Sequence, residues 1–222
     1  YFPKFPWFKM NNPYLTFPIN EESLKSTIEE ENIVINQIEK SIKDNLNDIA
    51  ALIIEPIQGE GGDNHFRDEF MVVLRNICDE NEIMLIFDEV QTGIGITGKM
   101  WAHEHFSIVP DMISFGKKTQ VCGFLSSDRI NEIENNVFKE SSRINSTFGG
   151  NLTDMVRFQM VLEIIEEEDL LENSKMLGEY LLNQLHNLVQ PHSIDLKHHL
   201  QVPYKKRCLT LYKDQQFDYL AP

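Results

Sequence analysis

The chain has 222 residues, of which 41% are hydrophobic and 25% are charged, the proportions of a globular protein with one domain and part of a second. Its formal net charge of −15 argues against nucleic acid and anionic membranes as partners. No apolar run approaches the roughly 18 residues that a membrane-spanning helix requires.

Residues 1–20 are rich in proline and aromatic side chains, which predicts an extended entry loop. They show neither the basic start nor the apolar stretch of a secretory signal. The first residue is Tyr1 rather than methionine, so we expect the chain to begin inside a longer protein.

Helical and strand patterns then alternate along the chain. Apolar residues recur at helical spacing over residues 21–47, which predicts one or two amphipathic helices. Residues 50–55 form a short apolar run that ends at Pro56, a pattern typical of a parallel strand buried on both faces. A glycine-rich loop follows, and residues 68–80 read as a second helix.

Further strands are expected at residues 83–87, 112–115 and 122–125, and a long amphipathic helix over residues 151–188. Alternating strands and helices predict an α/β fold with a mostly parallel sheet. Residues 21–188 would then be part of one large domain. Residues 189–222 show no sustained period and remain an unassigned tail.

The cysteines and histidines do not form a metal-binding pattern. Cys78, Cys122 and Cys208 lack CxxC spacing and cannot all pair, which suits a reducing cytoplasm. The histidines form no HExxH motif, so we expect no metal site.

Polar residues follow three of the expected strands, at the edge where ligands collect in open α/β sheets. Glu55 and the loop to Glu60 follow the first strand, Asp88 to Gln91 the second, and Lys117 the third. An aspartate and a lysine at strand ends can be no more than a salt bridge or a solvated pair. Together they are the groups that a pyridoxal-phosphate site needs, a lysine for the cofactor aldehyde and a carboxylate for the ring nitrogen.

The residues around these positions resemble the motifs of the class III, or ω-type, aminotransferases, over roughly residues 1–188. The similarity lies in four segments in order, EPIQGEGG at 55–62, FDEVQTG at 87–93, PDMISFGK at 110–117 and NSTFGGN at 145–151. GKKTQVCG at 116–123 is most similar to the lysine 6-aminotransferases. The resemblance implies a fold-type I large domain that is incomplete at both ends, because the remaining motifs of the family lie outside the chain and residues 189–222 do not match its C-terminal domain.

The resemblance also implies a role for each matching residue. Lys117 would carry the cofactor and move a proton, and Asp88 would pair with the ring nitrogen. Val90 would pack on the ring, with a plain core valine as the alternative. Gln91 would bind the phenolic oxygen and touch substrate. Lys118 matches no cofactor role and is expected to be a surface or structural lysine.

Three more residues carry expectations from the same resemblance. Thr147 would bind the phosphate of the partner subunit's cofactor, which implies a homodimer. Glu60 would act as a switch that uncovers an arginine for a dicarboxylate substrate, with a solvated turn glutamate as the alternative. Asn145 would contact substrate.

The implied activity is transfer of the ε-amino group of L-lysine to 2-oxoglutarate, which gives glutamate and an aldehyde that cyclises. One alternative is another ω-aminotransferase, for ornithine or 4-aminobutyrate. The other is an inactive truncated fragment that only folds or associates.

Overall fold

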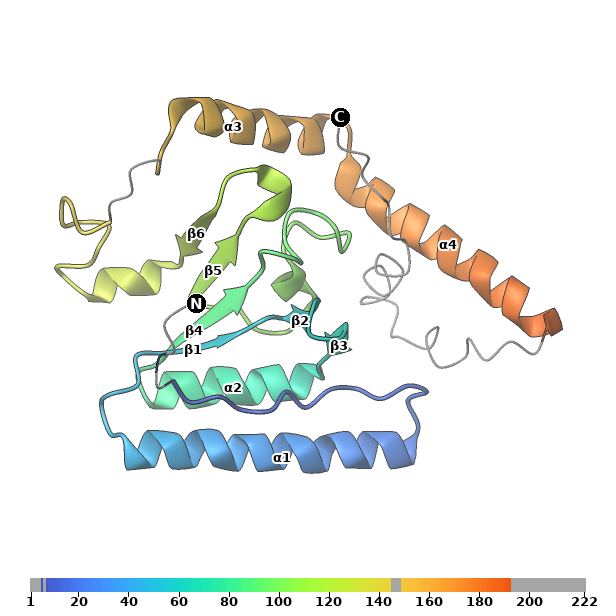
Figure 1. The fold of residues 1–222 in the computed structure, drawn as a ribbon, viewed down its shortest axis with the longest axis horizontal. Helices are drawn as coiled ribbons and strands as arrows, with labels where there is room; N and C mark the ends of the chain where they lie inside the picture. The colour runs from blue at the N-terminus through green and yellow to red at the C-terminus, as the bar shows by residue number, and fades with distance from the viewer. Residues whose placement is uncertain (1–4, 6, 145–148, 193–222) are drawn as a thin grey trace.

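A computed structural model describes residue 5, residues 7–144 and residues 149–192 of the chain. Its centre is a four-stranded sheet with the order β1-β4-β5-β6, made of β1 (Ala51–Ile54), β4 (Met84–Asp88), β5 (Met112–Phe115) and β6 (Gly123–Ser126) (Figure 1). Strands β1, β4 and β5 are parallel, and β6 is antiparallel to β5. The predicted α/β fold with a mostly parallel sheet is confirmed.

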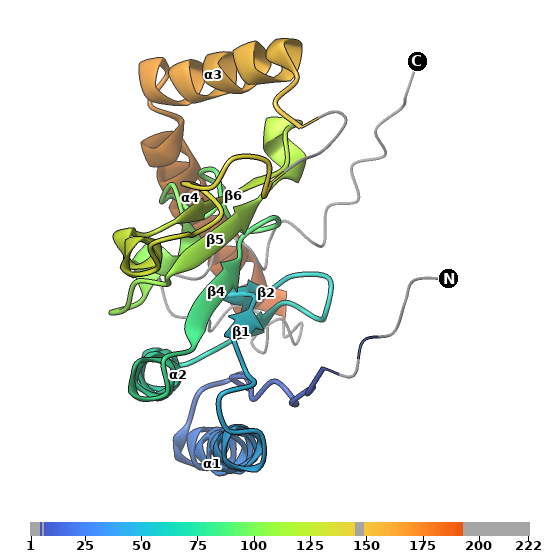
Figure 2. The same ribbon diagram turned by 90° about the vertical axis from the view of Figure 1, so that its left-hand side faces the viewer.

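Helices α1 (Glu21–Asp44) and α2 (Asp68–Glu80) form the layers on one side of this sheet (Figures 1 and 2). α2 packs on β4, and α1 lies outside α2. Asn20 starts α1 with a capping box, because its side chain accepts from the Ser23 backbone N–H while the Ser23 hydroxyl accepts from the backbone of Asn20. A single helix therefore covers most of the segment in which the spacing allowed one or two.

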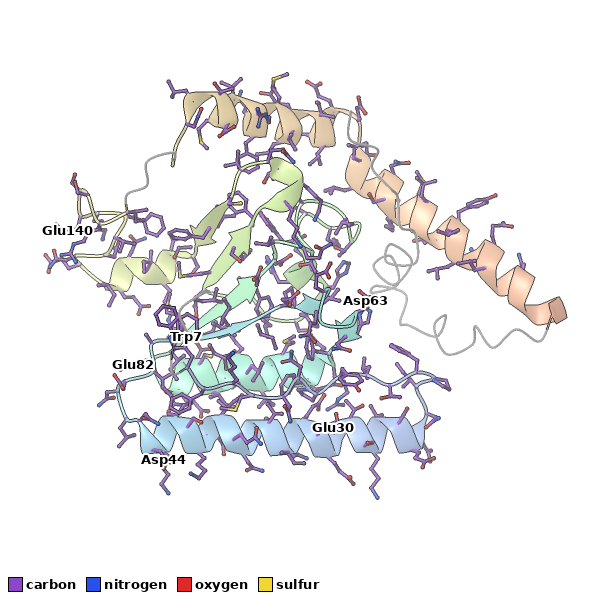
Figure 3. All side chains as sticks on the ribbon, viewed as in Figure 1. Trp7, Glu30, Asp44, Asp63, Glu82 and Glu140 are labelled. Carbon is purple, nitrogen blue, oxygen red and sulfur yellow. The ribbon has the colours of Figure 1, made fainter. Side chains whose placement is uncertain are left out.

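The main core lies between α2, α1 and the sheet. Fully buried side chains of α2 meet those of β4, and each contributes about 1.5–3 kcal/mol relative to exposure; they include Phe70, Met71, Leu74, Leu85 and Phe87. Many acidic residues instead lie on the outside, as Glu30 and Asp44 on α1 and Glu82 before β4 illustrate (Figure 3). This core fixes the position of β4, which carries Asp88 at its end.

Strand β1 is less buried than its sequence predicts. Ala51 is exposed and the side chain of Ile53 is 61% exposed, so the expectation of a strand buried on both faces is wrong. Strand β1 is at an edge of the sheet, and only the face with Leu52 and Ile54 packs against the core.

A hairpin replaces the expected plain loop between β1 and α2. Strands β2 (Ile57–Gln58) and β3 (Asn64–His65) pair antiparallel, and residues 59–63 form the turn between them. Gly62 has φ +130°, a backbone conformation that side chains rarely adopt, so the turn requires glycine there. The hairpin presents Glu60 at its tip.

The amino end of the sheet is held by a buried carboxylate. Asp111 Oδ2 accepts from the backbone N–H of Leu85 (2.7 Å), from Arg75 (2.9 Å) and from Arg129 (3.1 Å). Because these donors come from β4, α2 and the 3₁₀ helix η3 (Asp128–Glu132), one side chain joins three elements. It thereby fixes β4 relative to β5, whose opposite ends carry the candidate site.

The long helix expected over residues 151–188 is two helices, α3 (Leu152–Glu167) and α4 (Leu170–His192). Asp169 has φ 50°, which breaks the helical path between them. The acidic run 166–169 explains the break, since negative charge is unfavourable at the end of one helix and favourable at the start of the next. α3 lies beyond β5 and β6, at the far end of the sheet from α1 and α2 (Figures 1 and 2), and Phe158 stacks on Phe115 of β5 at a centroid distance of 5.3 Å.

Within the described residues, no helix is both long and apolar enough to cross a membrane.

Candidate active site

Asp88 stands at the carboxyl end of β4, beside the end of β5. Its Oδ1 accepts from the backbone N–H of Val90 and from the hydroxyl of Ser114, both at 3.1 Å. The first bond makes an Asx turn, and the second follows from the register, which places Asp88 opposite Ser114. Among the described residues, Oδ2 of Asp88 has no hydrogen-bond partner, so one oxygen is fixed and the other is available.

Lys117 begins the short 3₁₀ helix η2 (Lys117–Thr119) directly after β5. Its φ is 54°, in the left-handed region that a lysine rarely occupies. Strain of this kind costs about 1–3 kcal/mol and is concentrated at functional sites. The Gln120 backbone and side chain both donate to the Lys117 carbonyl, at 3.0 and 3.2 Å, and these bonds hold the turn.

Gln91 connects this turn with the end of β4. The Lys117 ammonium donates a hydrogen bond to Gln91 Oε1. Lys117, Asp88 and Gln91 are thus brought together at one edge of the sheet, as the sequence predicts.

The hairpin carrying Glu60 reaches the same edge. A Cβ at Gly59 would lie 2.9 Å from Gln91 Cγ, so the glycine backbone lies directly against the Gln91 side chain. Gly59 N–H also donates to Glu55 Oε2 at 3.1 Å, which ties the turn to the end of β1. Glu60 itself is exposed and makes no ion pair with the described residues.

Val90 faces the turn that carries Lys117. A Cβ at Gly116 would lie 3.7 Å from Val90 Cγ1 and 3.0 Å from Cys122 Sγ. Val90 is partly buried rather than part of the closed core. Its side chain is therefore close to the Lys117 turn, as a ring-packing residue would need to be.

A buried network beside the site was not anticipated from the sequence. Glu89 is fully buried, and its carboxylate accepts from the Thr92 hydroxyl (3.2 Å) and the backbone N–H groups of Ala102 (2.5 Å) and His103 (2.9 Å). Nδ1 of His103 lies 3.0 Å from the same carboxylate. The adjacent pair Asp88-Glu89 was a possible signal, because side chains alternate at a strand end and one of the two must face inward.

Lys118 is half-buried, which favours a structural lysine over a surface lysine, the two alternatives that the sequence left open. Its ammonium donates to the backbone carbonyl oxygen of Gln91 at 2.6 Å. Burial, together with the neighbouring charge of Lys117, lowers the pKa of Lys118 to about 8, whereas Glu89 acts in the opposite direction.

Thr147 and Asn145, which the sequence suggests as phosphate and substrate contacts, lie outside the described residues.

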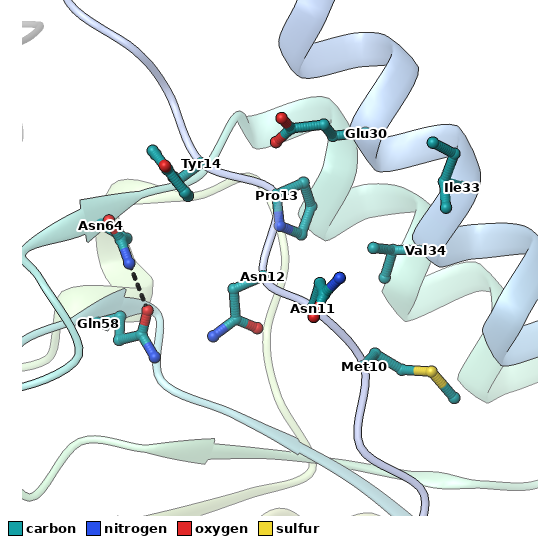
Figure 4. Close-up of a pocket in the computed structure, with 10 residues that line it drawn as sticks. All are labelled: Met10, Asn11, Asn12, Pro13, Tyr14, Glu30, Ile33, Val34, Gln58 and Asn64. Atoms are coloured by element: carbon teal, nitrogen blue, oxygen red, sulfur yellow. Dashed lines mark hydrogen bonds between the residues drawn. The ribbon is translucent and has the colours of Figure 1, made fainter.

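The structure also contains a groove of about 510 Å³ (Figure 4). It is enclosed by the segment 10–14, by α1 and by the hairpin, where Asn64 donates to Gln58 Oε1 at 2.6 Å. Lys117, Asp88 and Glu60 do not line it. The groove is therefore separate from the candidate active site.

Comparison with known families supports the similarity seen in the motifs. The family model described as Aminotransferase class-III matches residues 3–197. An L-lysine-epsilon aminotransferase of Mycobacterium tuberculosis is 47% identical over 187 residues, which cover 84% of this chain and 41% of the relative. A 4-aminobutyrate aminotransferase of Emericella nidulans is 38% identical over 190 residues, covering 85% of this chain and 37% of the relative.

Solved structures agree with this comparison. A lysine aminotransferase from M. tuberculosis superposes with a TM-score of 0.79 at 46% identity, covering 85% of this chain and 43% of that one. An amine transaminase from an uncultivated Pseudomonas species gives a TM-score of 0.67 at 32% identity, covering 83% of this chain and 43% of that one. The chain thus spans less than half the length of the relatives that it matches.

Proposed function

Because the chain belongs to the class III aminotransferases, whose cofactor is pyridoxal 5′-phosphate, we propose that the complete gene product transfers the ε-amino group of L-lysine to 2-oxoglutarate. The products would be glutamate and an aldehyde that cyclises. The observation that carries the reaction class is the convergence of Lys117, Asp88 and Gln91 at the carboxyl ends of β4 and β5.

Lysine as the amino donor is supported by the pattern of identities. The L-lysine-epsilon aminotransferases are 42–47% identical to this chain, whereas the 4-aminobutyrate aminotransferases are 35–38% identical. Ornithine and 4-aminobutyrate remain the competing donors.

The side chains at this edge fit the cofactor. They supply an amine that can bond to an aldehyde carbon, a carboxylate with one oxygen available, and an amide that can hydrogen-bond a phenolic oxygen. When bound, pyridoxal phosphate supplies an electron-withdrawing ring that stabilises negative charge on the substrate carbon.

Asp88 and Lys117 would then divide the work. The Asp88 carboxylate holds a proton on the ring nitrogen, and its two donors, Val90 N–H and Ser114, keep it aimed there. The Lys117 amine carries a proton away from the substrate carbon and returns one later. Val90 would pack against the face of the ring.

Gln91 and Glu60 would govern the substrate side. Gln91 donates to the phenolic oxygen, and its contact with the Gly59 backbone links it to the turn that carries Glu60. Glu60, exposed at the tip of that turn, covers an arginine in the lysine half-reaction and moves away for the dicarboxylate. Asn145 would contact substrate.

Thr147 would serve the neighbouring subunit. Its hydroxyl and backbone N–H both suit a phosphate oxygen. Binding of this kind requires a homodimer, so each site would be completed by its partner.

The attachment point is tested by borohydride reduction of cofactor-loaded protein, followed by peptide mapping. The cofactor label is expected on Lys117. Label on Lys118 alone would overturn the assignment.

The donor amine is tested by comparing turnover of L-lysine, L-ornithine and 4-aminobutyrate with 2-oxoglutarate as acceptor. The highest kcat/KM is expected for L-lysine. A higher value for either of the other amines would replace lysine as the substrate.

A further inference from the structure

Two adjacent lysines of η2 converge on one residue from different sides. Lys117 is exposed and donates to the side-chain oxygen Oε1 of Gln91. Lys118 is half-buried and donates to the backbone carbonyl oxygen of Gln91 at 2.6 Å. The side chain and the backbone of Gln91 are therefore held by separate amines.

Partial burial of the Lys118 ammonium group is unfavourable unless a negative charge or hydrogen-bond acceptors lie nearby. Its charged neighbours are Lys117 on the same turn and the fully buried Glu89, which follows β4. Glu89 is in turn held by Thr92 and by the backbone and ring of His103 in η1 (Ala102–His105). On α3, which packs against η2, Arg157 is paired with Asp154 at 3.1 Å. Glu89 is thus the negative charge that favours an ammonium group at this position.

The Gln91 side chain is confined on its other side. Gly59 lies so close that a Cβ there would be 2.9 Å from Gln91 Cγ. With its backbone held by Lys118 and its Cγ against Gly59, Gln91 has little freedom to turn away from Lys117.

We propose that Lys118 is a positioning residue, which holds the Gln91 carbonyl and thereby keeps the Gln91 side chain on the Lys117 amine. This role rests on the proposed function of Lys117 and Gln91 in cofactor binding, and it deepens that proposal. It assigns a task to the second lysine of the Lys-Lys pair, which has no direct contact with the Lys117 amine among the described hydrogen bonds.

The test is a double-mutant cycle on cofactor-free complete gene product. The rate at which acetic anhydride labels Lys117 is measured by mass spectrometry in wild type, Lys118→Met, Gln91→Ala and the double variant. Gln91→Ala keeps the carbonyl that Lys118 binds but removes the amide that meets Lys117. The loss of the positive charge at position 118 changes the Lys117 labelling rate equally in both backgrounds. The cycle therefore isolates the part of the Lys118→Met effect on this rate that depends on the Gln91 side chain.

We expect Lys118→Met to raise the Lys117 labelling rate more in the wild-type background than in the Gln91→Ala background. The ratio of the two increases should be about two- to tenfold, which is the effect of one hydrogen bond. Equal effects in both backgrounds would overturn the proposal. Lys118→Arg keeps a cationic donor and is expected to stay within about twofold of the wild-type rate. An increase for Lys118→Arg as large as that for Lys118→Met would also contradict the proposal. If Lys118→Met does not fold, Lys118→Arg takes its place in the test.

The outcome is independent of cofactor binding. Added pyridoxal phosphate is expected to give a visible absorbance band with the wild-type protein. Absence of that band would count against the proposed function, while the labelling cycle would still decide the role of Lys118.

Discussion

At the scale of single residues, the candidate site depends on hydrogen bonds that fix a few polar atoms. Asp88 has one oxygen held by Val90 N–H and Ser114, which leaves the other oriented for a ligand. Lys117 sits in a strained left-handed conformation at the end of β5. Both features lie at the carboxyl ends of β4 and β5, where the candidate site is.

Asp88→Asn is expected to separate cofactor attachment from proton transfer. The variant keeps the shape of the side chain, so attachment at Lys117 should persist. Loss of the charge should slow proton transfer by about 10²–10³-fold, the usual cost of removing one preorganised electrostatic partner. Rapid-mixing kinetics with L-lysine would measure this step.

Ser114→Ala is the matched control for Asp88→Asn, because it removes one donor to the carboxylate but keeps the charge. Its effect on the rate should be smaller. Turnover of Asp88→Asn at nearly the wild-type rate would mean that Asp88 is an ordinary strand-end carboxylate.

Lys118 should make stability depend on pH in the alkaline range. Its pKa is about 8 in the folded protein, against 10.5 for a lysine in an unperturbed environment, so between these values the unfolded chain binds more protons. The charged form opposes folding fully below pH 8, and this cost disappears as pH rises towards 10.5. The melting temperature of Lys118→Met relative to wild type should therefore fall as pH rises from 8 to 10.5.

The exposed Lys99 provides the control for this titration. Lys99→Met should change the pH dependence far less, because its amine stays in water. A melting-temperature difference for Lys118→Met that is constant across the range would show that Lys118 is not buried in the way described.

At the scale of elements, an ion pair with little solvent contact ties helix α1 to helix α2. Arg67, at the start of α2, makes a bidentate pair with Glu31 of α1, with N···O distances of 2.8–3.1 Å. The side chains of Arg67 and Glu31 are only 18% and 5% exposed. This pair joins α1 to α2 where the hairpin ends, and so supports the element that carries Glu60.

Glu31→Ala is expected to lower the free energy of unfolding by about 3 kcal/mol, because it leaves the largely buried Arg67 guanidinium with only the exposed Glu69, at 3.5 Å, as an ion-pair partner. Chemical denaturation would measure the change. Glu30→Ala, one position away on the exposed surface of α1, should stay within about 0.5 kcal/mol of wild type. Similar values for the two variants would show that the pair contributes nothing beyond helix propensity.

At the scale of the whole molecule, much apolar surface lies on the helices beyond the sheet. Val156, Met160 and Ile164 of α3 are 58%, 54% and 44% exposed, although they form the apolar side that the sequence pattern indicates. Exposed apolar surface of this kind marks interaction sites. It agrees with the proposed homodimer.

We therefore expect the protein to self-associate, and light scattering should give a mass above that of a monomer. Val156→Glu should weaken the association by adding a charge to the apolar surface. Thr153→Glu adds the same charge at the first turn of α3, where negative charge is favourable, and should leave association unchanged. A monodisperse monomer that binds cofactor tightly would contradict the proposal.

The sequence alone determined the four strands of the central sheet and placed Asp88, Gln91 and Lys117 at or just after the ends of two of them. Short apolar runs between helical segments specify parallel strands, and a polar residue directly after such a run must lie at the ligand-binding edge of the sheet. It also determined the boundaries of α2, because the helical spacing and the acidic first turn are local features.

Only the tertiary structure decided which side chains support the site. The burial of Glu89, the contact between Gly59 and Gln91 and the bond from Lys118 to the Gln91 carbonyl all join segments that are distant in the sequence. The exposure of Ile53 likewise depends on where β1 lies in the sheet rather than on its apolar neighbours. Periodicity reports the average environment of an element, whereas the partner of one side chain is set by packing between elements, which no local pattern encodes.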